Sequence, residues 1–181
     1  MNLSNLAREI YEVAHLTGSF TLRSGQVSQE YFDKYQFEAE PRVLDRISQA
    51  LVSLIPEGTE VLAGLEMGAI PIATALSLKS GIPAAFVRKK AKAYGTAKLA
   101  EGAVITGKQV CVIEDVITTG GQVLLSTHDL REAGAIVEDV ICVIERDPEG
   151  RRKLEEIGLR VHTLFKMEDL IKAGKMTPQG V

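Results

Sequence analysis

Cysteine is scarce in this sequence, with only two residues, Cys111 and Cys142, among 181. Each lies inside an apolar run typical of a β-strand, and neither has a histidine or a second cysteine beside it. A metal site needs clustered ligands, and a disulfide needs two cysteines that the fold brings together. We therefore expect two buried thiols on adjacent strands that serve packing rather than metal binding or cross-linking.

Long apolar runs are also missing. No run approaches the roughly 20 residues that a membrane-spanning helix requires. The first twenty residues carry Glu9, Glu12 and His15 where a signal peptide would have its apolar core. We expect no contact with a membrane and a cytoplasmic location.

Charge of either sign is not in large excess. The 21 lysines and arginines nearly balance the 24 aspartates and glutamates, for a net charge of -3. This balance gives no general attraction to nucleic acid or to an anionic membrane surface. With 45% hydrophobic residues and no repeat, low-complexity stretch or linker, residues 1–181 are expected to form one domain.

The most informative segment is residues 110–121, VCVIEDVITTGG. Four apolar residues precede Glu114 and Asp115; two more apolar residues, two threonines and two glycines follow, and residues 122–132 then have a helical pattern. This order predicts a buried strand that ends near Ile113, a polar loop and a helix start. In an open α/β sheet, ligands bind beyond the carboxyl ends of the strands, so this loop is the expected site.

The residue types in this loop suit a phosphorylated sugar. Thr118 and Thr119 offer hydroxyl groups, and the glycines after them expose backbone N–H groups that can hold a phosphate at a helix N-terminus. Carboxylates repel phosphate but accept hydrogen bonds from vicinal hydroxyl groups, which accounts for Glu114 and Asp115. The alternative is an ordinary strand followed by a helix that a threonine caps, with both acids in solvent.

The remaining patterns predict an α/β fold with a central parallel sheet flanked by helices and joined by right-handed crossovers. Residues 20–32 are expected to form a hairpin or strand-loop-strand. Apolar runs predict further strands at residues 61–64, 84–87, 136–144 and 160–165, and helical spacing predicts helices at residues 3–18, 41–55, 70–78, 148–157 and 167–173. The strand ends should gather these residues around one crevice: Glu66, Arg88, Lys89, Lys92, Glu114, Asp115, Thr118 and Arg146.

Residues 88–98, called the basic segment below, carry five cations and almost no large apolar residue. They follow the strand at residues 84–87, on the sheet edge that carries the phosphate loop. We expect them to act as a lid that attracts a polyanion. A solvated run of charge is the alternative.

Residues 113–121 resemble the phosphoribosyl pyrophosphate (PRPP) signature of the type I phosphoribosyltransferases, with two acidic residues, two apolar residues and a Thr/Gly loop behind an apolar strand. Thr-Leu-Arg-Ser-Gly at residues 21–25, followed by Ser28, Tyr31 and Phe32, resembles the N-terminal segment of orotate phosphoribosyltransferases. Arg-Lys-x-x-Lys-x-Tyr-Gly-Thr in the basic segment is similar to the catalytic loop of that family.

The resemblance implies transfer of the 5-phosphoribosyl group from PRPP to orotate, giving orotidine 5′-monophosphate and pyrophosphate, a step of pyrimidine (UMP) biosynthesis. It implies the type I fold, with residues 1–40 forming a hood over the base. Substitution at C1′ would pass through an oxocarbenium-like state, and positioning and leaving-group stabilisation would carry the catalysis.

Matched by position, the family's motifs imply a role for each candidate residue. Glu114 and Asp115 would bind the ribose hydroxyls, and residues 118–122 the 5′-phosphate. The implied catalytic cations of the lid are Arg88, Lys89 and Lys92. The implied orotate contacts are Tyr31, Phe32, Thr118 and Arg146, the last because a guanidinium pairs well with a carboxylate. The implied PRPP contacts are Arg23, Arg88, Lys89, Lys92, Tyr94, Glu114, Asp115, Val116, Ile117, Thr118, Thr119, Gly120, Gly121 and Gln122.

Two further properties follow from the resemblance. In the family the Lys89 position serves the neighbouring subunit's site, which implies a homodimer. Mg²⁺ would be held mainly through PRPP oxygens and water, since the sequence offers no dedicated cage of carboxylates. Within the lid, Lys92 is the residue whose loss we expect to be most damaging.

Three positions depart from the better-known family pattern. Arg23 and Met67 stand where many members have lysine, and Tyr94 stands where many have histidine. The residue contacts with pyrophosphate are therefore open, although Glu66 and the backbone around Met67 can still face the ligand.

Two other functions are compatible with a PRPP loop. A purine phosphoribosyltransferase would share the loop but should lack Arg146 as a carboxylate partner. A PRPP-sensing regulator would bind nucleic acid through a basic face beyond the lid, and the net charge of -3 gives no sign of such a face.

Overall fold

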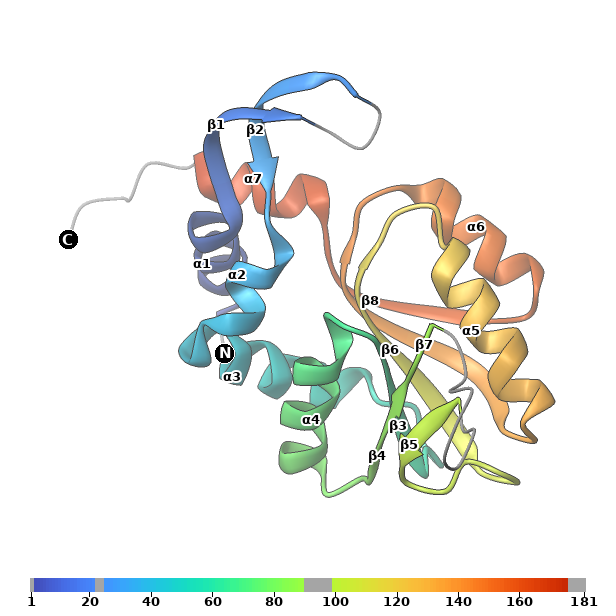
Figure 1. The fold of residues 1–181 in the computed structure, drawn as a ribbon. Coiled ribbons are helices and arrows are strands. Elements are labelled where there is room, and N and C mark those ends of the chain that lie inside the picture. Colours follow the sequence, from blue (N-terminus) through green and yellow to red (C-terminus); the bar gives the residue numbers. More distant parts are fainter. Residues whose placement is uncertain (1, 22–24, 90–98, 176–181) are drawn as a thin grey trace.

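A computed structural model describes residues 2–21, 25–89 and 99–175 of the chain. A six-stranded sheet carries helices on both faces, and a separate two-stranded hairpin stands beside it (Figure 1). The predicted fold class, a central and mostly parallel sheet flanked by helices, is confirmed.

The central sheet has the strand order β5-β4-β3-β6-β7-β8. Every neighbouring pair is parallel except β4 and β5, which are antiparallel. β3 is buried along its whole length, as expected for a central strand covered on both faces. The strands are β3 (Val61–Leu65), β4 (Ala84–Val87), β5 (Ala100–Gly102), β6 (Gln109–Ile117), β7 (Ile136–Glu145) and β8 (Arg160–Lys166).

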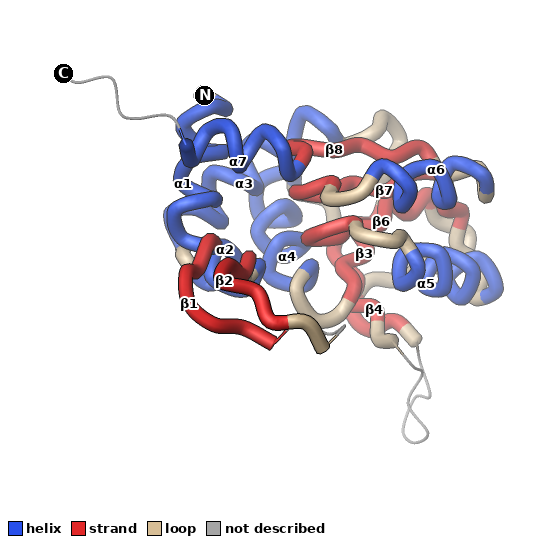
Figure 2. The backbone as a smooth tube through the Cα atoms, turned by 90° about the horizontal axis from the view of Figure 1, so that it is seen from above, coloured by secondary structure: helices blue, strands red, loops and turns tan. Residues whose placement is uncertain are grey.

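The helices divide between the two faces of the sheet (Figure 2). α1, α3 and α4 cover one face, and α5 and α6 cover the other; α7 packs on α1. The helices are α1 (Leu3–Ala14), α2 (Lys34–Ala39), α3 (Pro41–Leu51), a 3-10 turn (Val52–Leu54), α4 (Ala69–Ser80), α5 (Gly121–Glu132), α6 (Pro148–Glu156) and α7 (Met167–Lys175).

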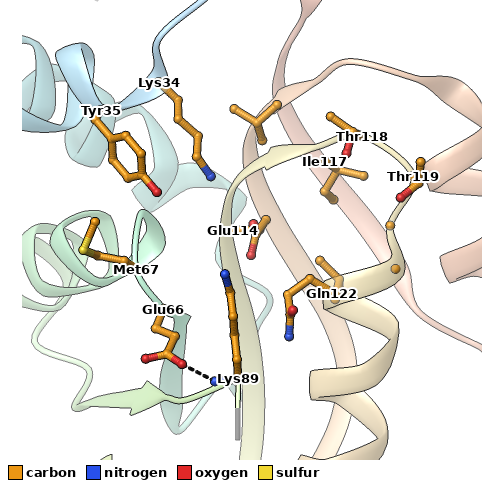
Figure 3. A pocket seen from close by; sticks show the side chains of 14 residues that line it. Lys34, Tyr35, Glu66, Met67, Lys89, Glu114, Ile117, Thr118, Thr119 and Gln122 are labelled. Atoms are coloured by element: carbon orange, nitrogen blue, oxygen red, sulfur yellow. Dashed lines mark hydrogen bonds between the residues drawn. The ribbon is translucent and has the colours of Figure 1, made fainter. Parts of the chain in front are cut away.

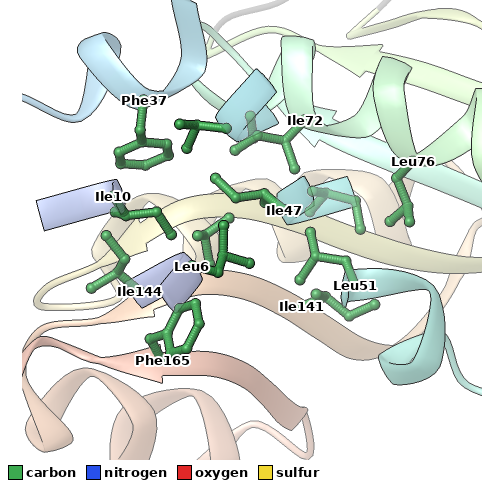
Figure 4. Packing of buried hydrophobic residues seen from close by; sticks show 14 of the residues in the cluster. Leu6, Ile10, Phe37, Ile47, Leu51, Ile72, Leu76, Ile141, Ile144 and Phe165 are labelled. Atoms are coloured by element: carbon green, nitrogen blue, oxygen red, sulfur yellow. The ribbon is translucent and has the colours of Figure 1, made fainter. Parts of the chain in front are cut away.

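The larger hydrophobic core lies between α1, α3, α4 and the sheet (Figure 4). Leu6 and Ile10 of α1 and Ile47 of α3 are fully buried there, against Ile141 of β7. Burial of one such side chain contributes about 1.5–3 kcal/mol. A second core, which includes Val112, lies under α5 and α6. Because both faces are covered, a ligand can reach the sheet only at the strand ends.

The N-terminal hairpin pairs β1 (His15–Thr21) with β2 (Val27–Phe32), antiparallel to each other. It confirms the predicted strand-loop-strand, although residues 22–24 lie outside the described residues. The first helix was expected to continue to Gly18, and this was wrong, because His15 and Leu16 pair with Phe32 and Tyr31.

The strand before the phosphate loop is longer than predicted. We expected it to end near Ile113, but β6 continues to Ile117. Glu114 pairs with Cys142, and Ile117 with Glu145, because β7 offers its backbone groups along this whole length. Glu114 and Asp115 therefore lie within the strand rather than in a loop after it.

The two cysteines lie on adjacent strands, as predicted. Cys111 of β6 and Cys142 of β7 are buried free thiols. Burial raises the pKa of Cys142 to about 12, so the reactive thiolate is scarce at neutral pH. In the part of the chain that the structure describes, no helix has the length and apolar character to cross a membrane.

Candidate active site

A cavity of about 420 Å³ opens where β3, β4 and β6 end (Figure 3). Its wall combines the end of β6, the start of α5 and the start of α2, which belongs to the N-terminal part of the chain. The lining residues are Lys34, Tyr35, Glu66, Met67, Lys89, Glu114, Val116, Ile117, Thr118, Thr119, Gly120, Gly121, Gln122 and Val123.

The loop between β6 and α5 has the geometry of a phosphate site. Gly120 is the N-cap of α5 and has φ 73°, a left-handed conformation that favours glycine. The first turn of α5, all of which the structure describes, carries no acidic side chain. Its unpaired backbone N–H groups and the positive end of the helix dipole are therefore available to an anion, beside the threonines of the loop.

α6 packs tightly against this loop. A side chain at Gly150 would place its Cβ 2.0 Å from the carbonyl oxygen of Thr118, and one at Gly120 would lie 2.9 Å from the carbonyl oxygen of Gly150. The two glycines let the backbones approach closely. The loop is thus fixed from behind by a helix that does not itself line the cavity.

The two acids of β6 face different surroundings. Glu114 lines the cavity, and burial, followed by the charge of Asp115, raises its pKa well above the ordinary value. Asp115 is only 1% exposed. One of its oxygens accepts a hydrogen bond from the backbone N–H of Val116, and the other lies 2.6 Å from Lys34 Nζ. Of the two acids, Glu114 is therefore the one whose side chain lines the cavity.

Lys34 and Glu38, both from α2, complete a group that we call the pocket cluster, with Glu114 and Asp115. Burial acts to lower the pKa of Lys34, but the hydrogen bond and the charge of Asp115 outweigh it and the pKa is raised. Glu38 is 6% exposed, and its burial, together with the charge of Asp115, raises its pKa to about 9. One cation thus faces three acids, two of which favour the protonated form.

Another part of the cavity wall is formed by the turn after β3 and the end of β4. The backbone N–H of Lys89 donates a hydrogen bond to the carboxylate of Glu66, and the peptide bond between Glu66 and Met67 is cis. Met67 is 64% exposed and lines the cavity. Figure 3 shows Lys34 and Lys89 pointing into the cavity from above and below Met67, across from Thr118 and Thr119.

The structure brings most of the predicted PRPP-binding residues to this one cavity. Within the described part of the chain, Arg88 and Asp115 are not part of its lining, since Arg88 Nε lies 4.0 Å from Glu101 of β5 and Asp115 is turned to Lys34. Arg23, Lys92 and Tyr94 lie outside the described residues. The predicted residues that line the cavity are Lys89, Glu114, Val116, Ile117, Thr118, Thr119, Gly120, Gly121 and Gln122.

The predicted base contacts meet at a second cavity. Tyr31, Phe32 and Arg146 line a space of about 300 Å³ beside the hairpin. The expectation of one crevice is therefore too simple, because the hairpin and α7 wall off a space of their own. The backbone N–H of Arg146 donates to the carbonyl of Ile117 at 2.8 Å, so Arg146 lies next to the loop that begins at Thr118. Thr118, the fourth predicted base contact, lines the first cavity.

Lys34 and Tyr35 are site residues that the sequence analysis missed. They begin α2, which has only six residues and is too short to show helical spacing. A local signal was present: the Asp33 side chain caps the helix by accepting from the backbone N–H of Tyr35. Phe32 and Phe37 flank this cap, with ring centroids 6.5 Å apart, as in a hydrophobic staple.

Metal-ligating side chains gather in one other place among the described residues. His128, Asp129 and Glu132 lie close together on α5, beyond its first turn, and they do not line the cavity. The cavity itself offers the carboxyl groups of Glu66 and Glu114. Two oxygen ligands suit a hydrated Mg²⁺ that a substrate brings with it, rather than a fully protein-bound ion.

Comparison with known proteins assigns the architecture. The phosphoribosyl transferase domain model matches residues 35–169. An orotate phosphoribosyltransferase of Nocardioides sp. is 53% identical over 167 residues, which cover 92% of this chain and 93% of the relative. The enzyme of the same name from Methanocella arvoryzae is 47% identical over 154 residues, covering 85% of this chain and 88% of the relative.

A solved structure shares both fold and length. The Mycobacterium tuberculosis orotate phosphoribosyltransferase in complex with PRPP superposes with a TM-score of 0.80 and is 30% identical, covering 93% of this chain and 98% of the other. Adenine phosphoribosyltransferase from Thermoanaerobacter pseudethanolicus, at 19% identity and a TM-score of 0.68, shares the fold.

Proposed function

Because this chain belongs to the phosphoribosyltransferase family, among its orotate phosphoribosyltransferases, we propose that it transfers the 5-phosphoribosyl group of PRPP to orotate. The products are orotidine 5′-monophosphate and pyrophosphate, so the reaction serves pyrimidine (UMP) biosynthesis. The relatives named for this activity match the chain over nearly its whole length.

One observation carries the proposal most strongly. The same cavity has a carboxyl group, that of Glu114, on one wall and a helix N-terminus with a Thr/Gly loop on another. A phosphate is attracted to the helix end and repelled by the acid, while sugar hydroxyls donate hydrogen bonds to the acid. A ribose 5-phosphate satisfies both groups at once.

The charge state of Glu114 fits this role. Its raised pKa favours a protonated acid in the ligand-free site. Hydroxyl donors from ribose stabilise the ionised form and so lower the pKa. Substrate binding is therefore proposed to shift Glu114 toward the charged form, which accepts hydrogen bonds from the 2′ and 3′ hydroxyls. Direct contact of Asp115 with a hydroxyl stays a prediction.

The base is proposed to enter beside the hairpin. Tyr31 and Phe32 offer aromatic surface, and Arg146 offers a planar guanidinium for the carboxylate of orotate. Thr118 then faces both the sugar and the base. The role of residues 1–40 as a hood over the base also stays a prediction.

Catalysis rests on the leaving pyrophosphate and on the exclusion of water. Lys89 lines the cavity on the side opposite the phosphate loop, where a diphosphate on C1′ would lie. Arg88 and Lys92 are proposed to add positive charge from the basic segment. Mg²⁺, bound mainly through PRPP oxygens and water and near Glu66 and Glu114, would neutralise part of the developing charge.

The assembly and the location of the protein are also proposals. A homodimer in which Lys89 serves the partner's site stays a prediction, and within one chain Lys89 already lines the cavity. The cytoplasmic location rests on the sequence, as argued above.

The decisive experiment is the loss of orotate absorbance when the purified protein is mixed with PRPP, Mg²⁺ and orotate, with adenine, hypoxanthine and uracil in parallel. We expect turnover of orotate alone. Turnover of a purine would reassign the base. Binding of PRPP without turnover of any base would instead identify a sensor.

A further inference from the structure

Lys34 enters the cavity from α2, a helix for which it is poorly suited. It occupies the first helical position, where the positive end of the helix dipole disfavours a cation. Its side chain nevertheless turns to the cavity and is 34% exposed there. Helix stability therefore does not explain a lysine at this position.

Asp115 holds Lys34 in place. The 2.6 Å contact joins a half-buried ammonium to an almost fully buried carboxylate. The other oxygen of Asp115 is fixed by the backbone of Val116, so the carboxylate has little freedom to turn. An ammonium group has three N–H donors, and one contact with Asp115 leaves two for a ligand.

The cavity needs such a cation on its far side. If the 5′-phosphate of PRPP binds at the start of α5, the diphosphate on C1′ points to the side formed by Met67, Lys89 and Lys34. Met67 is exposed there but has no charge. Among the described residues that line the cavity, Lys34 and Lys89 are the cations.

We propose that Lys34 is a PRPP-binding residue whose ammonium binds the diphosphate, and that Asp115 is the positioning residue that orients it. This inference rests on the proposed function. It assigns α2 a part in the site and explains how the cavity recognises a diphosphate with a methionine at position 67.

The test compares Lys34→Met with a matched control, Lys79→Met. Lys79 is also paired with a carboxylate, Asp45 at 2.8 Å, and is 31% exposed, but it lies in the last turn of α4 and does not line the cavity. Measured quantities are KM for PRPP, KM for orotate, the Kd of inorganic pyrophosphate by calorimetry, and Tm.

We expect Lys34→Met to raise KM for PRPP and the Kd of pyrophosphate by about tenfold or more, since hydrogen bonds to charged groups contribute at this level. KM for orotate should stay within about twofold. Lys79→Met should change none of these constants. An unchanged KM for PRPP, with only Tm lowered, would reduce Lys34 to a structural partner of Asp115 and overturn the inference.

Two additions keep the test decisive. Met67→Lys in the Lys34→Met background brings an ammonium back to the same wall and should restore pyrophosphate binding. If Lys34→Met does not fold, the wild-type protein is used instead. Its lysines are acetylated, and mass spectrometry follows the rate at each residue. Pyrophosphate should then slow acetylation of Lys34 and not of Lys79, and equal rates would refute the proposal.

The inference and the proposed function fail in different ways. A wild-type protein without turnover of any base refutes the proposed function, while the pyrophosphate measurements still report on Lys34. A wild-type protein that turns over orotate, with pyrophosphate affinity unaffected by Lys34→Met, refutes the inference alone.

Discussion

The protein contains two groups of buried acids, and they differ in how many hydrogen-bond donors surround each acid. The pocket cluster has Glu38, Glu114 and Asp115 around one cation, Lys34. The second group, called the edge cluster, consists of two acids near opposite ends of β7, each with its own partners from β8 or α6. Its acids are Asp139 and Glu145, its cations Arg151 and Arg160, and its other donors His162 and Thr163.

Each acid of the edge cluster is matched by donors. Arg160 holds Asp139 with two bonds of 2.8 and 2.6 Å, and these bonds lower the pKa of Asp139. Burial acts to raise the pKa of Glu145, but hydrogen bonds from Arg151 and Thr163 outweigh it, so the pKa is lowered. These acids are satisfied by the protein itself.

The difference separates structural charge from charge kept for a ligand. Burying acids without enough donors costs free energy, and a fold selected for stability alone would pair or remove them. The pocket cluster retains them, and one of them, Glu114, lines the cavity, where a ligand can supply hydroxyl donors. Strongly shifted pKa values are common at functional sites for this reason.

The largest expected effect comes from neutralising one acid in each cluster and comparing activity with stability. Glu114→Gln should lower kcat/KM for PRPP by about a hundredfold, roughly 2.7 kcal/mol, because an amide accepts more weakly from two ribose hydroxyls. Its Tm should not fall, since the acid already favours its neutral form. The measurements are steady-state kinetics and thermal unfolding.

Asp139→Asn is the matched control for this prediction. It should lower the unfolding free energy, because Arg160 and His162 lose a charged partner. The kinetic constants should be those of the wild type, since Asp139 does not line the cavity as the structure describes it. Loss of activity in Asp139→Asn equal to that in Glu114→Gln would remove the distinction between the clusters.

A pH series sharpens the contrast with an effect of intermediate size. Burial, followed by the charge of Asp115, raises the pKa of Glu38 to about 9 in the folded state, against an ordinary value near 4.5 in the unfolded chain. The folded state therefore binds more protons between these values, and unfolding free energy should fall as pH rises, by at most about 1.4 kcal/mol per pH unit. The groups that face Glu38 are Asp33, Lys34, Glu114 and Asp115.

Glu38→Gln removes this proton linkage. Urea unfolding at several pH values between about 5.5 and 8.5 should show a flatter dependence in Glu38→Gln than in the wild type. For the edge cluster, the unfolding free energy should depend on pH in the opposite direction. The pKa values of Asp139 and Glu145 are lowered, so the stabilisation that these acids contribute is lost only as pH falls below the ordinary range of carboxyl groups. Identical slopes in the two proteins would show that Glu38 is ionised at neutral pH.

The sequence predicted those parts of the molecule whose signals are local and strong. The strand at residues 84–87 and the helix after the phosphate loop were found almost to the residue, because apolar runs and glycine boundaries mark them. The candidate residues from Val116 to Gln122 line one cavity, as the order of residue types indicated.

The features that could not be predicted from the sequence depend on contacts between residues far apart in the chain. β6 continues past Ile113 because β7 pairs with it, and no local pattern shows how long a neighbour is. β5 has three residues and exists because it pairs with β4. The pocket cluster joins Lys34 to Asp115 across 81 positions of sequence, so the partner of that acid was invisible until the chain was folded.

The prediction with the smallest expected effect tests whether the acids of the edge cluster have as many donors as the hydrogen bonds indicate. Thr163 Oγ1 donates to Glu145 at 3.0 Å and accepts from Arg151 at 2.8 Å. Thr163→Val removes both bonds but leaves two from Arg151 to Glu145. Unfolding free energy measured in urea should therefore fall by only about 1 kcal/mol, with kinetic constants unchanged and with Thr163→Ser close to the wild type. A loss above about 3 kcal/mol would mean that Arg151 alone leaves Glu145 unsatisfied. The edge cluster would then resemble the pocket cluster, and a shortage of donors would no longer distinguish the acids that await a ligand.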